Sequence, residues 1–177
     1  MRSYSGPLSP TLSRMSYHQI EHHIVIGGNP MDEKRCGGCE CGDIRYEFCC
    51  EPLTCYTCHC TDCQTRSGSA FSTAVAIPSD QLGVTQGELS QWDFGSGYFK
   101  FCDHCGTHLW GVADVLPEFS MIRVGTLDDS ACVAPVAHIW ADSALPWVEL
   151  GDKLTRFPGQ PENPLMLLEE WNKVHGS

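Results

Sequence analysis

A chain of 177 residues is the size of one ordinary domain and is long enough to bury a core without disulfide bonds. Its formal net charge is −11 and it holds only 11 Lys and Arg residues, so it lacks the clustered basic side chains that displace counterions from nucleic acid. No stretch of about 18 apolar residues occurs, which excludes a membrane-spanning helix. We therefore expect neither nucleic acid nor a membrane as a partner.

The 12 cysteines indicate either an oxidised secreted scaffold or metal ligation. Residues 1–30 hold no sustained apolar segment of the kind found in a signal peptide, because the longest apolar run there is Ile24-Val25-Ile26. The thiols are therefore expected to stay reduced, in the cytoplasm.

Residues 1–34 are rich in Ser, Pro, His and Gly and show no hydrophobic period, which predicts a disordered leader. Within this leader, residues 18–22 match the H-x-x-E-H pattern of certain zinc peptidases. That pattern requires a stable helix, and nothing caps or continues one here, so we interpret the match as chance.

Short β-prone segments separated by Gly, Pro and Asp follow the leader. They predict a mainly β, mainly antiparallel fold within a single domain over residues 35–158. The expected strands are residues 44–48, 70–77, 98–101, 108–112, 120–124 and 136–140.

Only the C-terminal segment, residues 159–177, has a convincing helical pattern. Asn163 is suited to cap a helix, Pro164 fits its first turn, and Leu167, Trp171 and Val174 recur at helical spacing. We expect a short helix that packs these three side chains against the domain.

Three thiols and an imidazole lie within the six-residue run Cys58–Cys63 (CHCTDC). Zinc prefers sulfur ligands in a tetrahedron at about 2.3 Å, and three thiolates leave a fourth position open, as catalytic zinc sites do. We therefore predict a catalytic zinc on Cys58, Cys60 and Cys63. The alternatives are that His59 or Cys55 closes the shell, or that the thiols pair with one another.

Two further cysteine pairs lie far apart in the sequence but have short internal spacing. Each pair is followed directly by a glycine, which permits the turn that points backbone amides at thiolates. Two such turns can together make one closed tetrahedral site. The alternative is that the four thiols are buried separately and bind no metal. We predict a structural zinc, and so two zinc ions per chain, with the ligands Cys39, Cys41, Cys102 and Cys105.

Polar residues after the Cys58–Cys63 run are candidates for binding substrate, although such residues also form turns. They are Gln64, Arg66, Ser67 and Ser69. His138 is a further candidate for the pocket, whereas His108 is interpreted as a core or cleft-wall histidine.

Local positive charge for an anionic substrate is scarce, and most basic side chains are interpreted as solvated. The candidates are Arg35, Arg45, Arg66, Lys100 and Arg123. Asp128 and Asp129 are possible general acids, but they follow Gly125-Thr126-Leu127 and are first interpreted as a turn.

Several of these motifs, taken in order over roughly residues 36–157, resemble those of one known family. The motifs are residues 38–42 (GCECG), 58–64 (CHCTDCQ), 101–107 (FCDHCGT), 125–128 (GTLD), 138–140 (HIW) and 146–147 (PW). They are similar to those of the glutathione-dependent formaldehyde-activating enzyme and centromere protein V family.

The resemblance implies a zinc-bound, folded-over antiparallel arrangement called a β-tent. It also implies that Cys39, Cys41, Cys102 and Cys105 hold a structural zinc, and that Cys58, Cys60 and Cys63 hold a catalytic one. Founding members condense formaldehyde with glutathione, which is a carbon–sulfur lyase reaction run in reverse.

We therefore expect a zinc-dependent carbon–sulfur lyase that acts on the adduct of a glutathione-like thiol with a small aldehyde such as formaldehyde. Two other functions stay open at this point. One is a non-catalytic zinc module for a protein partner, and the other is a thiol redox switch at residues 55–63.

Overall fold

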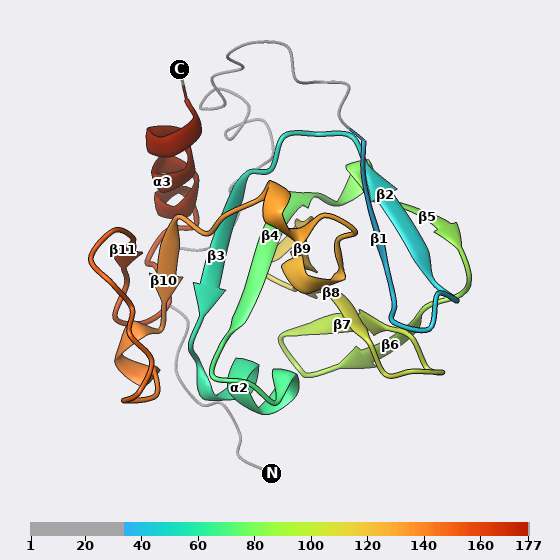
Figure 1. The fold of residues 1–177 in the computed structure, drawn as a ribbon, viewed down its shortest axis with the longest axis horizontal. Helices are drawn as coiled ribbons and strands as arrows, with labels where there is room; N and C mark the ends of the chain where they lie inside the picture. The colour runs from blue at the N-terminus through green and yellow to red at the C-terminus, as the bar shows by residue number, and fades with distance from the viewer. Residues whose placement is uncertain (1–33, 177) are drawn as a thin grey trace.

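The computed structural model describes residues 34–176, which form two β-sheets and two α-helices (Figure 1). The strands are β1 (Arg35–Gly38), β2 (Arg45–Phe48), β3 (Thr54–Cys58), β4 (Ser72–Pro78), β5 (Gly83–Gln86), β6 (Ser90–Asp93), β7 (Gly97–Phe101), β8 (His108–Ala113), β9 (Leu116–Arg123), β10 (Ala137–Ile139) and β11 (Thr155–Arg156). The α-helices are α2 (Thr61–Ser67) and α3 (Leu165–His175), and short 3-10 helices are η2 (Ser79–Gln81), η3 (Val124–Thr126), η4 (Ser130–Cys132) and η5 (Ala141–Ser143). The predicted mainly β fold with a short C-terminal helix is confirmed.

The larger sheet has eight strands in the order β11-β10-β3-β4-β9-β8-β7-β6, and the smaller sheet has the order β1-β2-β5. All pairs are antiparallel except β10 with β3 and β10 with β11, which are parallel. These two parallel pairs are the departure from the expected antiparallel pattern. Long connections make them possible, residues 59–136 between β3 and β10 and residues 140–154 between β10 and β11, since parallel neighbours cannot be joined by a tight turn.

The central strand β4 is buried along almost its whole length, because it lies between β3 and β9. Its apolar side chains, such as Val75 and Ile77, pack in the same core as Tyr46 and Phe48 of the small sheet. The Tyr46 ring meets Trp110 of β8 edge to face, with ring centroids 5.7 Å apart. This contact joins the two sheets into one core.

Helix α2 was not expected, because its seven residues carry no apolar stripe and none of them is buried. Local capping explains it. The Cys60 sulfur accepts a hydrogen bond from the Cys63 amide at 3.3 Å, Asp62 lies in the first turn, and Gly68 ends the helix in a left-handed conformation.

Helix α3 forms where it was predicted, and Asn163 caps it through its side-chain oxygen, which accepts from the Leu165 amide at 2.9 Å. Leu167 and Trp171 are buried against the core as expected. The expectation for Val174 is wrong, because its side chain is 66% exposed and Leu168 is buried in its place.

The division into a leader, a zinc-binding domain and a C-terminal helix stays a prediction. The H-x-x-E-H match at residues 18–22 lies outside the described residues. Within residues 34–176, neither helix has the length and apolar character needed to cross a membrane.

Candidate metal centres and the adjoining pocket

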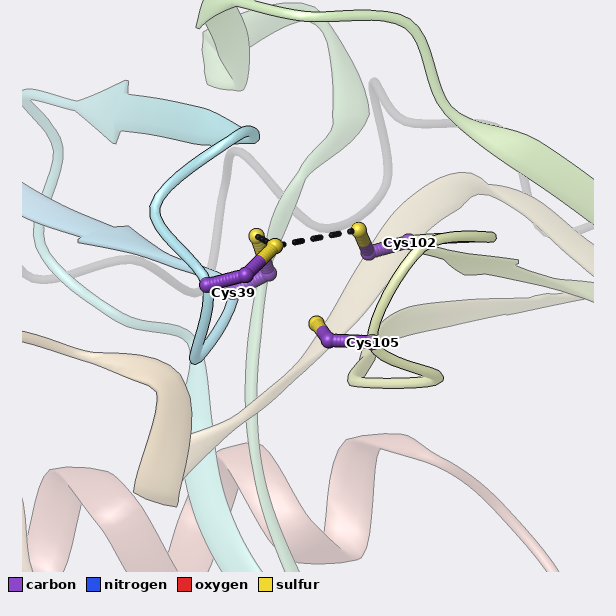
Figure 2. Close-up of side chains that lie close together, drawn as sticks. Cys39, Cys102 and Cys105 are labelled. Carbon is purple, nitrogen blue, oxygen red and sulfur yellow. Dashed lines mark hydrogen bonds between the residues drawn. The ribbon is translucent and has the colours of Figure 1, made fainter.

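The first cysteine cluster joins two turns that lie far apart in the sequence. Cys39 and Cys41 lie in the turn between β1 and β2, and Cys102 and Cys105 lie in the turn after β7. The four sulfur atoms all lie within 4.8 Å of one another, and Figure 2 shows the side chains of the two turns converging. The sequence prediction that these four side chains come together is therefore confirmed.

The spacing of these sulfur atoms fits a tetrahedral metal. Ligands at about 2.3 Å in a tetrahedron lie about 3.8 Å apart. The Cys41 sulfur lies 3.4 Å from that of Cys39 and 3.7 Å from that of Cys102. Both following glycines adopt a positive φ, 84° at Gly42 and 75° at Gly106, so each turn needs a glycine there.

Hydrogen-bond donors around the first cluster favour the thiolate form at two of its four cysteines, Cys39 and Cys105. The Ile44 amide donates to the Cys39 sulfur at 3.2 Å. The side chain and backbone of Thr107 lower the pKa of the Cys105 thiol to about 6. Because zinc binds the thiolate, these donors prepare the cluster for a metal. A third group, formed by Cys41, Asp43 and His104, is exposed and shares Cys41 with this cluster.

The second cluster forms where β3 ends and α2 begins. Cys58 is the last residue of β3, Cys60 caps α2 and Cys63 lies in its first turn, which brings their sulfur atoms within 4.8 Å of one another. In the described part of the chain, no carboxylate, imidazole or further thiol joins this group.

The charges in the second cluster favour a bound cation. Hydrogen bonds with Cys58 and Cys60, together with Ser72 and the charge of Arg123, lower the pKa of Cys63 to about 2 despite its burial. Hydrogen bonds with Cys60 and Cys63 raise the pKa of Cys58 instead. One sulfur thus holds the negative charge while its neighbours stay protonated, and a bound cation would offset the repulsion among three thiolates.

Cys55 does not close the second cluster. It lies three residues before Cys58, on the opposite face of β3, and it is fully buried. Burial raises its pKa to about 12, as expected for an un-ionised thiol in a core.

His59 also points away from the sulfur atoms, into a buried network with Thr57 and His138. The His138 Nε2 lies 3.1 Å from the Leu150 carbonyl, which only accepts, so Nε2 carries the hydrogen. The Nδ1 of His138 therefore accepts from the His59 Nε2 at 3.0 Å. Burial lowers the pKa of both rings, which keeps this pair neutral.

A pocket of about 390 Å³ opens beside the second cluster. It is lined by Cys63, Arg66, Ser67, Ser72, Thr73, Gly106, His108, Arg123 and Gly125. Residues from α2, β4 and β9 thus meet Gly106, which directly follows Cys105 of the first cluster, so this pocket connects the second cluster to the turn of the first.

The predicted substrate residues divide into two groups. Arg66 and Ser67 line the pocket. The Gln64 amide instead donates to the His59 and Ser143 carbonyls, at 2.7 and 2.9 Å, and thereby ties α2 to the loop after β10. His138 lies in the buried network described above and is not among the lining residues. Their roles in substrate binding stay predictions.

Two further lining residues had weaker assignments from the sequence. Arg123 was one of five candidates for local positive charge, most of which were interpreted as solvated, and His108 was interpreted as a core or cleft-wall histidine. Arg123 donates to the Ser72 hydroxyl at 2.6 Å, and this hydrogen bond connects β9 to β4 at the pocket. The interpretation of Asp129 as a turn residue is confirmed, since its side chain accepts from the Ala131 amide at 3.1 Å.

The family model described as "Glutathione-dependent formaldehyde-activating enzyme" matches residues 34–143, more than half of the chain. This chain belongs to that family. The match includes every cysteine of both clusters, so the resemblance noted in the sequence is confirmed.

Other comparisons add little to the family assignment. A solved structure of a Rhodobacter sphaeroides protein is 26% identical in sequence and has a TM-score of 0.47. The alignment covers 56% of this chain and 91% of that protein. No curated protein matches the chain.

Proposed function

We propose that this member of the formaldehyde-activating family is a zinc-dependent carbon–sulfur lyase, which joins a thiol to a small aldehyde and releases it again. The observation that supports the proposal is a cluster of three sulfur atoms that has no fourth ligand among the described residues and lies against a pocket through Cys63. An open ligand position beside a pocket is typical of catalytic rather than structural zinc.

The reaction needs no oxidant or reductant. In the forward direction the substrate sulfur forms a bond to the aldehyde carbon, the C=O π bond opens, and the oxygen takes up the proton that the thiol has lost. A zinc ion on Cys58, Cys60 and Cys63, when bound, supplies a position at which a substrate thiol loses its proton and stays nucleophilic.

The other pocket residues bind and orient the substrate. Arg66 and Ser67, which lie one turn after the cysteines on α2, are proposed to contact it. Gln64 and His138 are proposed to be positioning residues that do not contact the substrate, because their hydrogen bonds hold α2 and β10 in place around the cluster. The first cluster is proposed to hold the second zinc ion in a purely structural role.

The test is the rate of adduct formation between glutathione and formaldehyde, followed by NMR above the spontaneous rate. Cys60→Ser is expected to abolish the acceleration. Cys49→Ser is the matched control, because Cys49 is exposed and lies outside both clusters. The proposal is rejected if the wild-type chain with two zinc ions gives no acceleration with any thiol, or if Cys60→Ser retains it.

The close approach of the three sulfur atoms also favours a second candidate, a thiol switch. Hydrogen peroxide would accept two electrons from two of the thiolates, an S–S bond would form, and zinc would be released. Under this alternative, stoichiometric peroxide releases one zinc ion per chain, and a dithiol reductant restores binding. A lyase without a switch retains both ions under the same mild treatment.

A further inference from the structure

A second, smaller pocket continues the one beside Cys63. It has a volume of about 180 Å³ and is lined by Trp92, Phe99 and Phe101, together with three residues that the larger pocket also has. The shared residues are Arg66, Gly106 and His108. The two pockets therefore form one groove, which runs from the sulfur cluster past Arg66 to an aromatic end at Trp92.

The charge in the middle of this groove is positive, although the chain as a whole has a net charge of −11. Arg66 and Arg123 both line the groove, and none of the lining residues is Asp or Glu. Within residues 34–176 no carboxylate pairs with Arg123, whose described polar contact is the Ser72 hydroxyl. The lining residues hold one anionic group, the Cys63 sulfur, whose pKa the charge of Arg123 helps to lower. Two guanidinium groups thus face one negative charge, and this balance favours an anionic ligand.

Arg66 is held in place before any ligand binds. Its Nε donates to the Asp62 carbonyl at 3.1 Å, and its guanidinium lies 4.5 Å from the centroid of the Phe99 ring. The Asp62 carboxylate lies 3.4 Å from the guanidinium, but it is half-exposed and lies outside the lining. These contacts involve Nε and one terminal nitrogen, and the other terminal nitrogen has N–H groups to donate to a carboxylate in the pocket.

His108 adds an unused hydrogen-bonding atom to the same place. Its Nε2 is buried and has no partner among the described residues. Burial, with the charges of Arg123 and Arg66, lowers its pKa to about 4, so the ring is neutral at physiological pH. A neutral imidazole between two arginines provides one more hydrogen bond without adding charge.

We infer that the groove selects an anionic thiol with an apolar arm: the carboxylate is held by Arg66 and Arg123, and the arm lies against Trp92 and Phe99. The groove disfavours thiols that carry an ammonium group, because its lining offers two guanidinium groups and no carboxylate. Glutathione carries an ammonium group beside its carboxylates, so it is a poorer match than a mercaptocarboxylate that carries an aromatic arm. The inference rests on the proposed function only for the position of the sulfur.

The first test uses ligands without sulfur, on the full chain with both zinc ions bound. Isothermal titration compares 3-phenylpropionate with its neutral amide and with phenethylammonium. We expect the carboxylate to bind about tenfold more tightly than the amide, with an affinity that falls as salt rises, and the ammonium not to bind. Equal binding of carboxylate and amide overturns the inference.

Variants then locate the site. Arg123→Gln is expected to weaken 3-phenylpropionate binding about tenfold, and Arg123→Lys to restore part of it. The control is Arg156→Gln, since Arg156 is exposed and lines neither pocket.

Trp92→Ala tests the aromatic end of the groove. It is expected to weaken binding of 3-phenylpropionate but not of acetate, and the control is Trp147→Ala, because Trp147 is exposed. Zinc content and circular dichroism check that each variant is folded, and unchanged affinity in folded Arg123→Gln overturns the inference.

Turnover separates this inference from the proposed function. We expect kcat/KM for formaldehyde to be highest with 2-benzyl-3-mercaptopropionate, which carries a thiol, a carboxylate and an apolar arm, lower with glutathione and lowest with cysteamine. Equal values for the three thiols reject the selection inferred here and leave the lyase proposal standing. Carboxylate binding without turnover for any thiol rejects the lyase proposal and leaves the anion site standing.

Discussion

Replacing Cys102 by Ser tests whether the first cluster holds the fold together. Cys102 is buried, and its sulfur meets that of Cys41, which lies 61 positions earlier in the chain. A metal on the cluster therefore cross-links a long loop of the unfolded chain. By analogy with a disulfide, closing a loop of this length stabilises the folded state by about 4 kcal/mol.

This magnitude is large relative to the total stability of a domain, which is about 5–15 kcal/mol. For a chain of this size it corresponds to a fall in melting temperature of about 10 °C. The assay is thermal unfolding followed by circular dichroism, combined with zinc content by elemental analysis. We expect Cys102→Ser to lose one zinc ion and to melt about 10 °C below the wild type.

The matched variant is Cys60→Ser in the second cluster. Its three cysteines lie within one six-residue run, so a metal there closes only a very short loop and adds little cross-linking. We expect Cys60→Ser to lose one zinc ion but to melt within about 3 °C of the wild type. The division into a structural and a catalytic site is refuted if both variants melt alike, or if Cys102→Ser retains two zinc ions.

Three further changes probe the surroundings of the clusters. Gly37→Ala would place a Cβ 2.3 Å from the Tyr46 hydroxyl, so we expect the clash to destabilise the fold by about 1–3 kcal/mol in urea unfolding. An unchanged urea midpoint would contradict this expectation. Cys55→Ser is expected to retain both zinc ions, but its free energy of unfolding is expected to fall by about 1–3 kcal/mol because the variant buries a hydroxyl in the core. Loss of one zinc ion would instead identify Cys55 as a ligand. His108→Gln is expected to flatten the pH dependence of unfolding between about pH 6.5 and 4. The unfolded ring takes up a proton near pH 6.5 and the folded ring only near pH 4, so the wild type loses stability as the pH is lowered through that window. The loss is roughly 1–2 kcal/mol after allowance for the partly exposed ring. Equal slopes in variant and wild type would contradict this.

The metal ligands could be predicted from the sequence because ligand spacing is a local property. Two closely spaced cysteines followed by a glycine favour a turn, and a closed structural zinc site takes four such sulfur atoms. The structure brings Cys39 and Cys41 to Cys102 and Cys105, as the spacing predicted. The predicted strands were found for a similar reason, since short runs of β-prone residues bounded by Gly and Pro are also a local property.

Helix α2 and the parallel pairing of β10 could not be predicted in this way. Helix α2 is seven residues long with no buried face, and its stability comes from the Cys60 cap and Gly68 rather than from a periodic pattern. Strand β10 has three residues, and its pairing with β3 and β11 depends on where the intervening chain returns. Neither feature has a signal within its own residues.

The groove illustrates the same limit at the level of function. Arg66 lies on α2 and Arg123 at the end of β9, and only the pairing of β4 with both β3 and β9 brings them to one pocket. From the sequence, each arginine is one of 11 basic residues in an acidic chain, and a solvated position is the better interpretation. The cysteine spacing thus identifies where sulfur chemistry takes place, whereas the choice of substrate depends on residues that only the sheet order brings together. Members of this family with the same cysteines but a different residue at the position of Arg123 are therefore expected to differ in the thiol they accept and not in the metal they bind.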